Sequence, residues 1–101
     1  MTKTKEVVRF LKKRLENDLK LRQYYEEEKI NLQVAQAIRD AREAEGLTQK
    51  GLAEMIGTTQ SVISRLEDAD YEGHSLSMLQ RIATALRKRL SIRMDSFEEV
   101  A

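Results

Sequence analysis

Apolar residues recur at intervals of three and four along the first third of the chain, which is the period of an amphipathic helix. They are Val8, Leu11, Leu15 and Leu19, followed by Leu21, Tyr25 and Leu32. Asn17 and Asp18 are candidate caps between two helices, although the two pieces could also form one. The pattern predicts a helical N-terminal arm over residues 1–33.

Beyond residue 33 the pattern predicts a helix with Val34, Ile38 and Ala41 on one face. We expect this helix to end at Gly46, because glycine adopts the left-handed conformation without strain. Thr48 then precedes the short segment "QKGLAEMI" and can cap a helix there with its hydroxyl. That helix is expected to end at Gly57.

Two further helices are expected after Gly57. One begins after Thr58 or Thr59 and runs to about Asp68, with Ile63 and Leu66 on its apolar side. The next begins at Ser75 or Ser77, where Ser77 and Gln80 fit a capping box. Its apolar positions are Leu79, Ile82, Ala83 and Leu86.

Residues 90–94, "LSIRM", alternate apolar and polar side chains, which is the period of a β-strand. The apolar positions are Leu90, Ile92 and Met94. A single strand leaves its backbone groups unpaired, and no other segment alternates as clearly. We therefore expect this strand to pair with its own copy across a twofold axis, with residues 90–101 forming a strand and an acidic tail.

The composition limits the classes of function that the chain can have. Its 101 residues are 41% hydrophobic and 35% charged, which suits one helical domain with a modest core. No apolar run has the length of a membrane span, and the N-terminus does not resemble a signal peptide, so a cytoplasmic protein is expected. With no cysteine and one histidine, we expect no metal and no cofactor. Because the carboxylates lie along helical faces without a convergent site, we expect no enzyme.

Charge is separated by segment although the net charge is only +1. Between Ser75 and Met94 the charged residues are all basic: Arg81, Arg87, Lys88, Arg89 and Arg93. Just before them, Glu67, Asp68, Asp70 and Glu72 form an acidic loop. The small net charge therefore conceals local patches of either sign.

Residues 51–68, "GLAEMIGTTQSVISRLED", have the form of a helix-turn-helix, in which two short helices meet at a tight turn containing glycine. Ala53 is small where the helices cross, and Gly57 lies in the turn. Leu52, Ile56, Ile63 and Leu66 are apolar where the pair meets its core. A hairpin that only filled a core would not need the polar run from Thr58 to Ser61.

The segment "LTQKGLAEMIGTTQSVISRLE" resembles the DNA-binding motif of the Xre family, the lambdoid phage repressor type. The matching positions are Thr48, Gln49, Leu52, Ala53, Gly57, Ile63 and Glu67, and the resemblance covers residues 34–86. It implies an all-α, lambda-repressor-like helix-turn-helix bundle of four to five helices, with the DNA-binding domain over residues 34–89. The helical arm would precede this domain and the short C-terminal β-strand would follow it. The resemblance also implies a structural ion pair between Arg42 and Glu67.

A helix fits the major groove of DNA, and the residues on its first turns reach the base edges. The side chains predicted to contact bases are Thr59, Gln60, Ser61, Ser64 and Arg65. Gln60 can bind adenine and Arg65 guanine in bidentate fashion, and Thr59, or Val62 if it lies outside the core, can offer a methyl group to thymine. The candidates for the DNA backbone are Gln49, by resemblance, and Lys50, Thr58, Ser75, Ser77 and Arg81. The acidic loop Asp68 to Glu72 departs from the family pattern and would repel phosphate.

The layout outside the motif resembles the HigA-like antitoxins, with a charged arm containing "RQYYEEEKINLQVAQAIRDAREAEGLTQ" and a strand like "LSIRM". This resemblance implies a homodimer that represses its own operon at a palindromic operator and neutralises a toxic ribonuclease encoded beside it. Two alternatives remain. One is a stand-alone Xre-type repressor from a phage or mobile element, in which residues 1–33 only pack or dimerise. The other is a protein-interaction module that has lost DNA binding, an interpretation favoured by the acidic loop.

Overall fold

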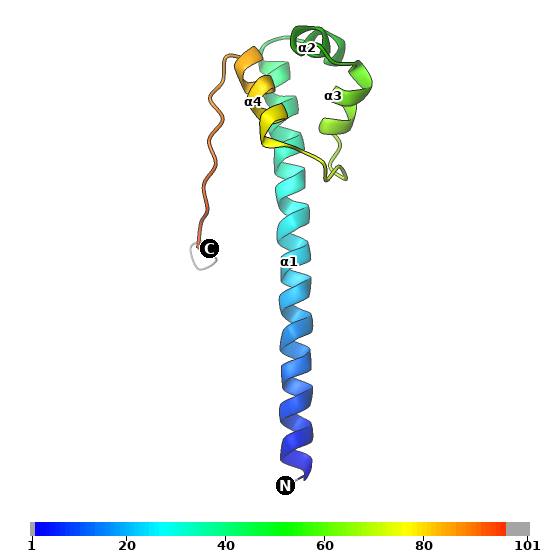
Figure 1. Cartoon of the computed structure of the whole chain (residues 1–101), viewed down its shortest axis with the longest axis vertical. Helices are drawn as coiled ribbons and strands as arrows, with labels where there is room; N and C mark the ends of the chain where they lie inside the picture. The colour runs from blue at the N-terminus through cyan, green and yellow to red at the C-terminus, as the bar shows by residue number, and fades with distance from the viewer. Residues whose placement is uncertain (1, 97–101) are drawn as a thin grey trace.

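The computed structural model describes residues 2–96, which form four α-helices. These are α1 (Thr2–Ala44), α2 (Gln49–Ile56), α3 (Gln60–Leu66) and α4 (Leu76–Ala85). Figure 1 shows α2, α3 and α4 gathered around the C-terminal end of α1, while the rest of α1 projects away. The molecule measures 68 × 28 × 20 Å, so it is a small helical head on a long helical arm.

The arm is one continuous helix, so of the two alternatives that the sequence left open the single helix is formed, and Asn17 and Asp18 do not cap a second one. Thr2–Ala44 contains neither glycine nor proline, and Asn17 and Asp18 are exposed, so nothing in this segment forces the helix to end. The helix also crosses residues 33 and 34 without interruption. None of the helices within residues 2–96 is both long and apolar enough to cross a membrane.

The core lies where the three short helices meet the C-terminal end of α1. Its buried apolar side chains are Ala35, Ile38, Leu52, Ala53, Ile56, Ile63, Leu66, Ile82, Ala83 and Leu86. Val34, Ala41, Val62 and Leu79 pack against it from the edge. The apolar helical faces predicted between residues 34 and 86 are therefore confirmed.

Two glycines end helices in the left-handed conformation, as expected. Gly46 has φ 70° and Gly57 has φ 73°, backbone angles that residues with a Cβ atom rarely adopt. The tight turn after α2 is closed by the Thr58 amide, which donates to the Ala53 carbonyl at 2.9 Å. Thr48 caps α2, accepting from the Gly51 amide at 2.9 Å, so this prediction is confirmed too.

Helix α4 is capped by Ser75, and the capping box predicted for Ser77 and Gln80 is wrong. The Ser75 hydroxyl accepts from the Met78 amide at 3.2 Å, which places Ser77 inside the helix. The Gln80 amide donates instead to the Thr84 hydroxyl one turn later. Ser75 and Ser77 both fit the sequence rule for a helix cap. The path of the acidic loop before them determines which serine caps α4.

The β-strand predicted over Leu90, Ile92 and Met94 is not formed in residues 2–96. This segment leaves α4 as an extended chain on the α4 side of the head (Figure 1). Leu90 is half-buried, whereas Ile92 and Met94 are exposed, Met94 almost completely at 96%. A strand needs a neighbouring strand for its backbone hydrogen bonds, and one copy of the chain does not supply it.

Candidate nucleic-acid interface

Helix α3 turns its apolar side to the core and its polar side outward. Ile63 and Leu66 are buried against α2, and Val62 packs at the edge of the core, so it is not available as a thymine contact. The five side chains predicted to contact bases are all exposed: Thr59, Gln60, Ser61, Ser64 and Arg65. Figure 1 shows α3 on the other side of the α1 end from α4, so α4 does not cover the outward face of α3.

The hydroxyl of Thr59 caps α3 by accepting from the Val62 amide at 3.3 Å. Thr59→Ala should therefore lower the free energy of unfolding by about 1 kcal/mol, the usual value of such a cap. Thr59→Ser keeps the cap oxygen and loses only the methyl group. Urea denaturation should show wild-type stability for the serine variant, while its affinity falls only for half-sites with thymine at the contacted position. Equal destabilisation by both substitutions would contradict the capping role.

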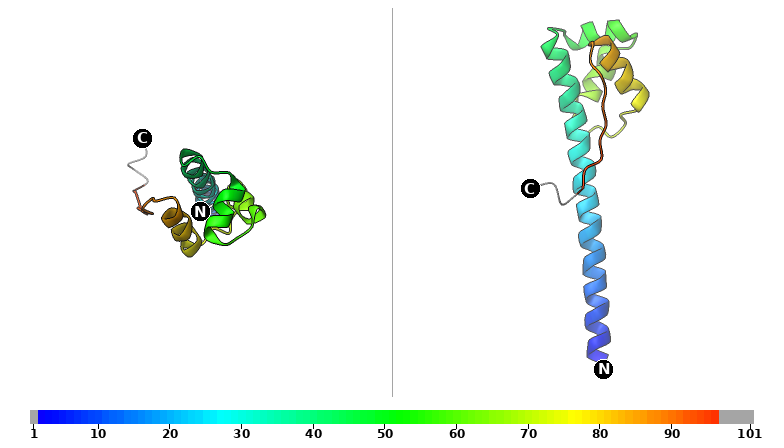
Figure 2. Two further views of the ribbon diagram at one scale, coloured as in Figure 1. Left: turned by 90° about the horizontal axis from the view of Figure 1, so that it is seen from above. Right: turned by 90° about the vertical axis from the view of Figure 1, so that its left-hand side faces the viewer.

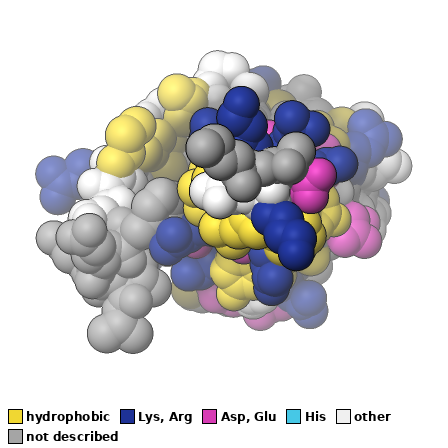
Figure 3. Space-filling model, turned by 90° about the horizontal axis from the view of Figure 1, so that it is seen from below, with side chains coloured by type: hydrophobic (Ala, Val, Ile, Leu, Met, Phe, Trp, Pro, Cys, Tyr) yellow, Lys and Arg dark blue, Asp and Glu magenta, His cyan; other side chains and the backbone are white. Residues whose placement is uncertain are grey.

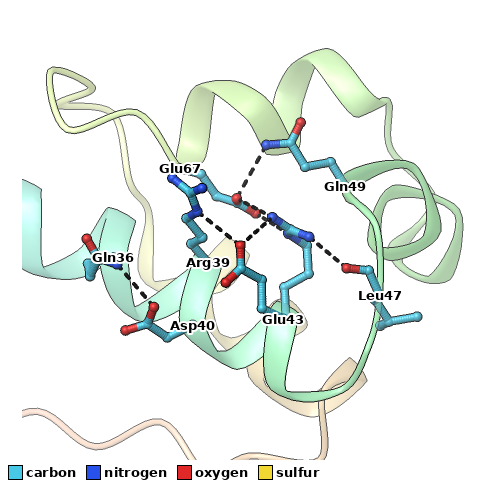
Figure 4. A network of polar contacts seen from close by, with 8 residues as sticks. Gln36, Arg39, Asp40, Glu43, Leu47, Gln49 and Glu67 are labelled. Carbon is cyan, nitrogen blue, oxygen red and sulfur yellow. Dashed lines mark hydrogen bonds and ion pairs between the residues drawn. The ribbon is translucent and has the colours of Figure 1, made fainter.

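Arg42 and Glu67 form a buried bidentate ion pair that joins α1 to the end of α3 (Figure 4). Arg42 donates from Nε to Glu67 Oε2 at 2.7 Å and from Nη2 to Oε1 at 3.0 Å. Its Nη1 donates to the Leu47 carbonyl at 2.6 Å, just before α2. The side chains of Arg42 and Glu67 are only 10% and 3% exposed. One guanidinium thus fixes the helix-turn-helix at both ends, and its hydrogen bond to Glu67 raises the pKa of Arg42 above its ordinary value.

Several predicted DNA-backbone residues already have partners within the head. The Gln49 amide donates to Glu67 Oε1 at 3.3 Å, so Gln49 belongs to the Arg42 network (Figure 4). The hydroxyls of Ser75 and Ser77 lie 3.4 Å apart at the start of α4. Arg81 donates from Nη2 to the Ile56 carbonyl and so covers the C-terminal end of α2. Lys50 is exposed on α2 and Thr58 is half-buried in the turn.

The acidic loop follows the C-terminal end of α3, on the side of the head facing the arm (Figure 1). Gln60 lies at the opposite end of this helix, which is about 10 Å long. Two residues that the sequence did not identify as structural hold the loop against α3. His74 Nε2 lies 2.7 Å from the Leu66 carbonyl, and the ring of Tyr71 meets that of His74 edge to face at 5.0 Å. The carboxylates therefore sit beyond the last turn of α3, away from its first turn.

The comparisons with known proteins agree with this geometry. A helix-turn-helix family model (HTH_3) matches residues 38–92, which is more than half of the chain. The chain belongs to this family. The family assignment makes it a DNA-binding transcription regulator that acts on double-stranded DNA. The match begins within α1, so most of the arm lies outside the family domain. No curated protein and no solved structure matches the chain.

Proposed function

We propose that the protein is a homodimeric repressor that binds a palindromic operator through α3. The outward polar face of α3 carries this proposal, because Gln60 and Arg65 are the two side-chain types best suited to read adenine and guanine. The proposal assigns no catalytic step to the chain. Its residue roles are base contact for Thr59, Gln60, Ser61, Ser64 and Arg65, and backbone contact for Gln49, Lys50, Thr58, Ser75, Ser77 and Arg81.

Two copies are needed because one head carries little positive charge near α3. Within the motif the basic residues are Lys50 and Arg65, and neutralisation of phosphates supplies most nonspecific affinity. The exposed Ile92 and Met94 support pairing of residues 90–94 between two copies. Such a twofold dimer would present two α3 helices to half-sites about 34 Å apart.

Gel-shift titration with the DNA just upstream of the gene tests this proposal. We expect a complex that weakens steeply with salt and that is about 1000-fold tighter than the complex with unrelated DNA. Ile92→Arg should reduce binding to the palindrome far more than binding to a single half-site. If no complex forms even at low salt, the repressor proposal fails, and the alternative of an interaction module without DNA binding gains support.

A second candidate function is neutralisation of a ribonuclease toxin encoded beside the gene. The observation that favours it is the pair of exposed aromatic side chains on the arm, Tyr24 and Tyr25, which are followed by Glu26, Glu27 and Glu28. Exposed tyrosines are common anchors in protein interfaces, and an acidic run complements a basic enzyme. The toxin-binding surface would then lie on the part of α1 that precedes the family domain.

Co-purification with the product of the adjacent reading frame tests this second function. Tyr24→Ser with Tyr25→Ser should abolish the complex, whereas Phe10→Ser, at an equally exposed aromatic position of the arm, should retain it. Retention of the neighbour by the double tyrosine variant would exclude this surface. A neighbour that does not bind the wild-type chain would exclude the antitoxin function.

A further inference from the structure

The projecting half of α1 exposes apolar side chains over a long distance. Every residue from Lys3 to Tyr25 is exposed, and the first buried residue after them in α1 is Ala35. Figure 2 shows this part of α1 projecting away from the other helices. Most of the stability of helices in proteins comes from packing an apolar face, and solitary helices are marginal in water. The exposed leucines of the arm therefore indicate a surface that is covered in the functional assembly.

The apolar residues of the arm form one straight stripe. Val8, Leu11, Leu15 and Leu19 follow one another at intervals of three and four, and Val8, Leu19 and Ile30 are eleven residues apart. A repeat of eleven residues is close to three turns of an α-helix, so the stripe does not drift around the helix. Leu11 and Leu15 are 56% and 60% exposed. Gln23 and Glu26 interrupt the stripe after Leu19, which confines its apolar part to residues 8–19.

Charge divides the arm into two halves of opposite sign. Residues 3–14 contain six basic side chains and one acidic side chain, a net charge of +5. Residues 16–28 contain five acidic and two basic side chains, a net charge of −3. Figure 3, which looks along the arm from its N-terminal end, shows Lys and Arg side chains crowded around hydrophobic ones. The arm is therefore complementary to a reversed copy of itself.

We propose that the arms of two copies pair antiparallel, with a twofold axis near Leu15. In this register Leu15 faces Leu15 of the second copy. Leu11 of each copy faces Leu19 of the other. The same register brings Lys12 and Arg14 to the level of Asp18 and Glu16 of the second copy. The basic half of each arm lies along the acidic half of the other, whereas a parallel pair would place like charges side by side.

The position of the axis separates this contact from the DNA-binding dimer. Ile38 in the head is 23 residues from Leu15, which corresponds to about 35 Å along the helix. The two heads of an arm pair are therefore about 70 Å apart, twice the half-site spacing of a palindrome. The arm pair joins two separate DNA-bound units, and residues 90–94 join the two heads within one unit. The assignment of the arm pair to two DNA-bound units rests on the proposed function, whereas the pairing of the arms itself does not.

Sedimentation velocity of the full chain without DNA tests the pairing. The Ile92→Arg variant removes the proposed strand contact and should still be a dimer. Adding Leu11→Gln and Leu15→Gln should weaken that dimer at least tenfold and yield monomers. The matched control is Phe10→Gln with Leu21→Gln, on the opposite side of the helix with exposures of 63% and 67%, and it should remain dimeric. An Ile92→Arg variant that is monomeric, or a leucine variant that stays dimeric, overturns the proposal even if operator binding is intact.

The orientation is tested by cross-linking, for which the absence of cysteine from the chain is an advantage. In the antiparallel register, Val8 lies within one residue of the level of Gln23 of the second copy, and Gln23 lies on the continuation of the stripe. A mixture of Val8→Cys and Gln23→Cys chains should be joined by a short bismaleimide, while Val8→Cys alone should not. Cross-linking of Val8→Cys to itself would show a parallel pair and overturn the register. The proposal is also wrong if the arms do not dimerise and the product of the adjacent reading frame binds through Leu11 and Leu15. The stripe would then be the binding surface for that protein.

Discussion

Replacing Gln60 and Arg65 together by alanine should abolish selective operator binding while leaving the fold intact. Each bidentate contact to a base contributes about 1–3 kcal/mol to discrimination, so the pair accounts for about 2–6 kcal/mol. The affinity for the operator should fall by a factor of about 30 to 25,000. Both side chains are exposed on α3 and contribute nothing to the core, so the melting temperature should change little.

The chain offers a control with the same two residue types. Gln36 and Arg39 are exposed on α1, where they interact with Asp40 and Glu43 (Figure 4). Gln36→Ala with Arg39→Ala removes the same charge and the same amide from α1 and leaves the outward face of α3 unchanged. Gel-shift titration at one salt concentration should show a loss of less than about threefold for this control, since exposed charges away from the interface are largely screened. Equal losses in the two double variants would mean that α3 does not read bases.

Replacing Arg42 by alanine should lower the free energy of unfolding far more than Thr59→Ala does. Glu67 would remain without its cation in a site that is 3% exposed, where the Gln49 amide at 3.3 Å is its remaining side-chain partner among residues 2–96. Removing one partner of a buried ion pair costs about 3–5 kcal/mol. For a domain of this size the melting temperature should fall by about 12–40 °C, as measured by circular dichroism.

Three comparisons distinguish the ion pair from other effects of Arg42. Glu43→Ala removes a half-exposed carboxylate 3.8 Å from Arg42 and should cost less than about 0.5 kcal/mol. Arg42→Met with Glu67→Met should be more stable than Arg42→Ala, because no unpaired charge stays buried. At a temperature where Arg42→Ala is folded, its operator affinity should lie within about threefold of wild type, because the pair lies beneath the interface. A large loss of affinity at unchanged stability would contradict a structural role.

The sequence predicts the helix-turn-helix because its determinants act over a few residues. Thr48 caps α2 with a hydroxyl three residues from the amide it accepts, and Thr59 does the same for α3. Gly46 and Gly57 end helices through their own backbone conformation. The spacing of Leu52, Ile56, Ile63 and Leu66 then places the buried faces. Each of these rules can be applied without knowledge of the rest of the chain.

The predictions that failed depended on segments distant in the chain or on a second molecule. At Asn17 and Asp18 the sequence left two alternatives open, because these residues cap a helix only where the chain has another reason to leave the helical conformation. The choice of Ser75 over Ser77 depends on the path of the acidic loop, which His74 fixes through the Leu66 carbonyl. Arg81 reaches the Ile56 carbonyl 25 residues away, a contact without any local signal. Residues 90–94 have the period of a strand, but a second copy is needed to show whether they form one.

The uninterrupted course of α1 also restricts how the length of the chain can vary. Because the helix that carries Leu15 also carries Ile38 and Arg42 into the head, the two parts of the molecule are in a fixed rotational phase. Insertion of one residue between them would turn the leucine stripe by about 100° relative to α3, and insertion of eleven would return it to within about 20°. Viable insertions in this part of the gene should therefore come in lengths that complete whole helical turns.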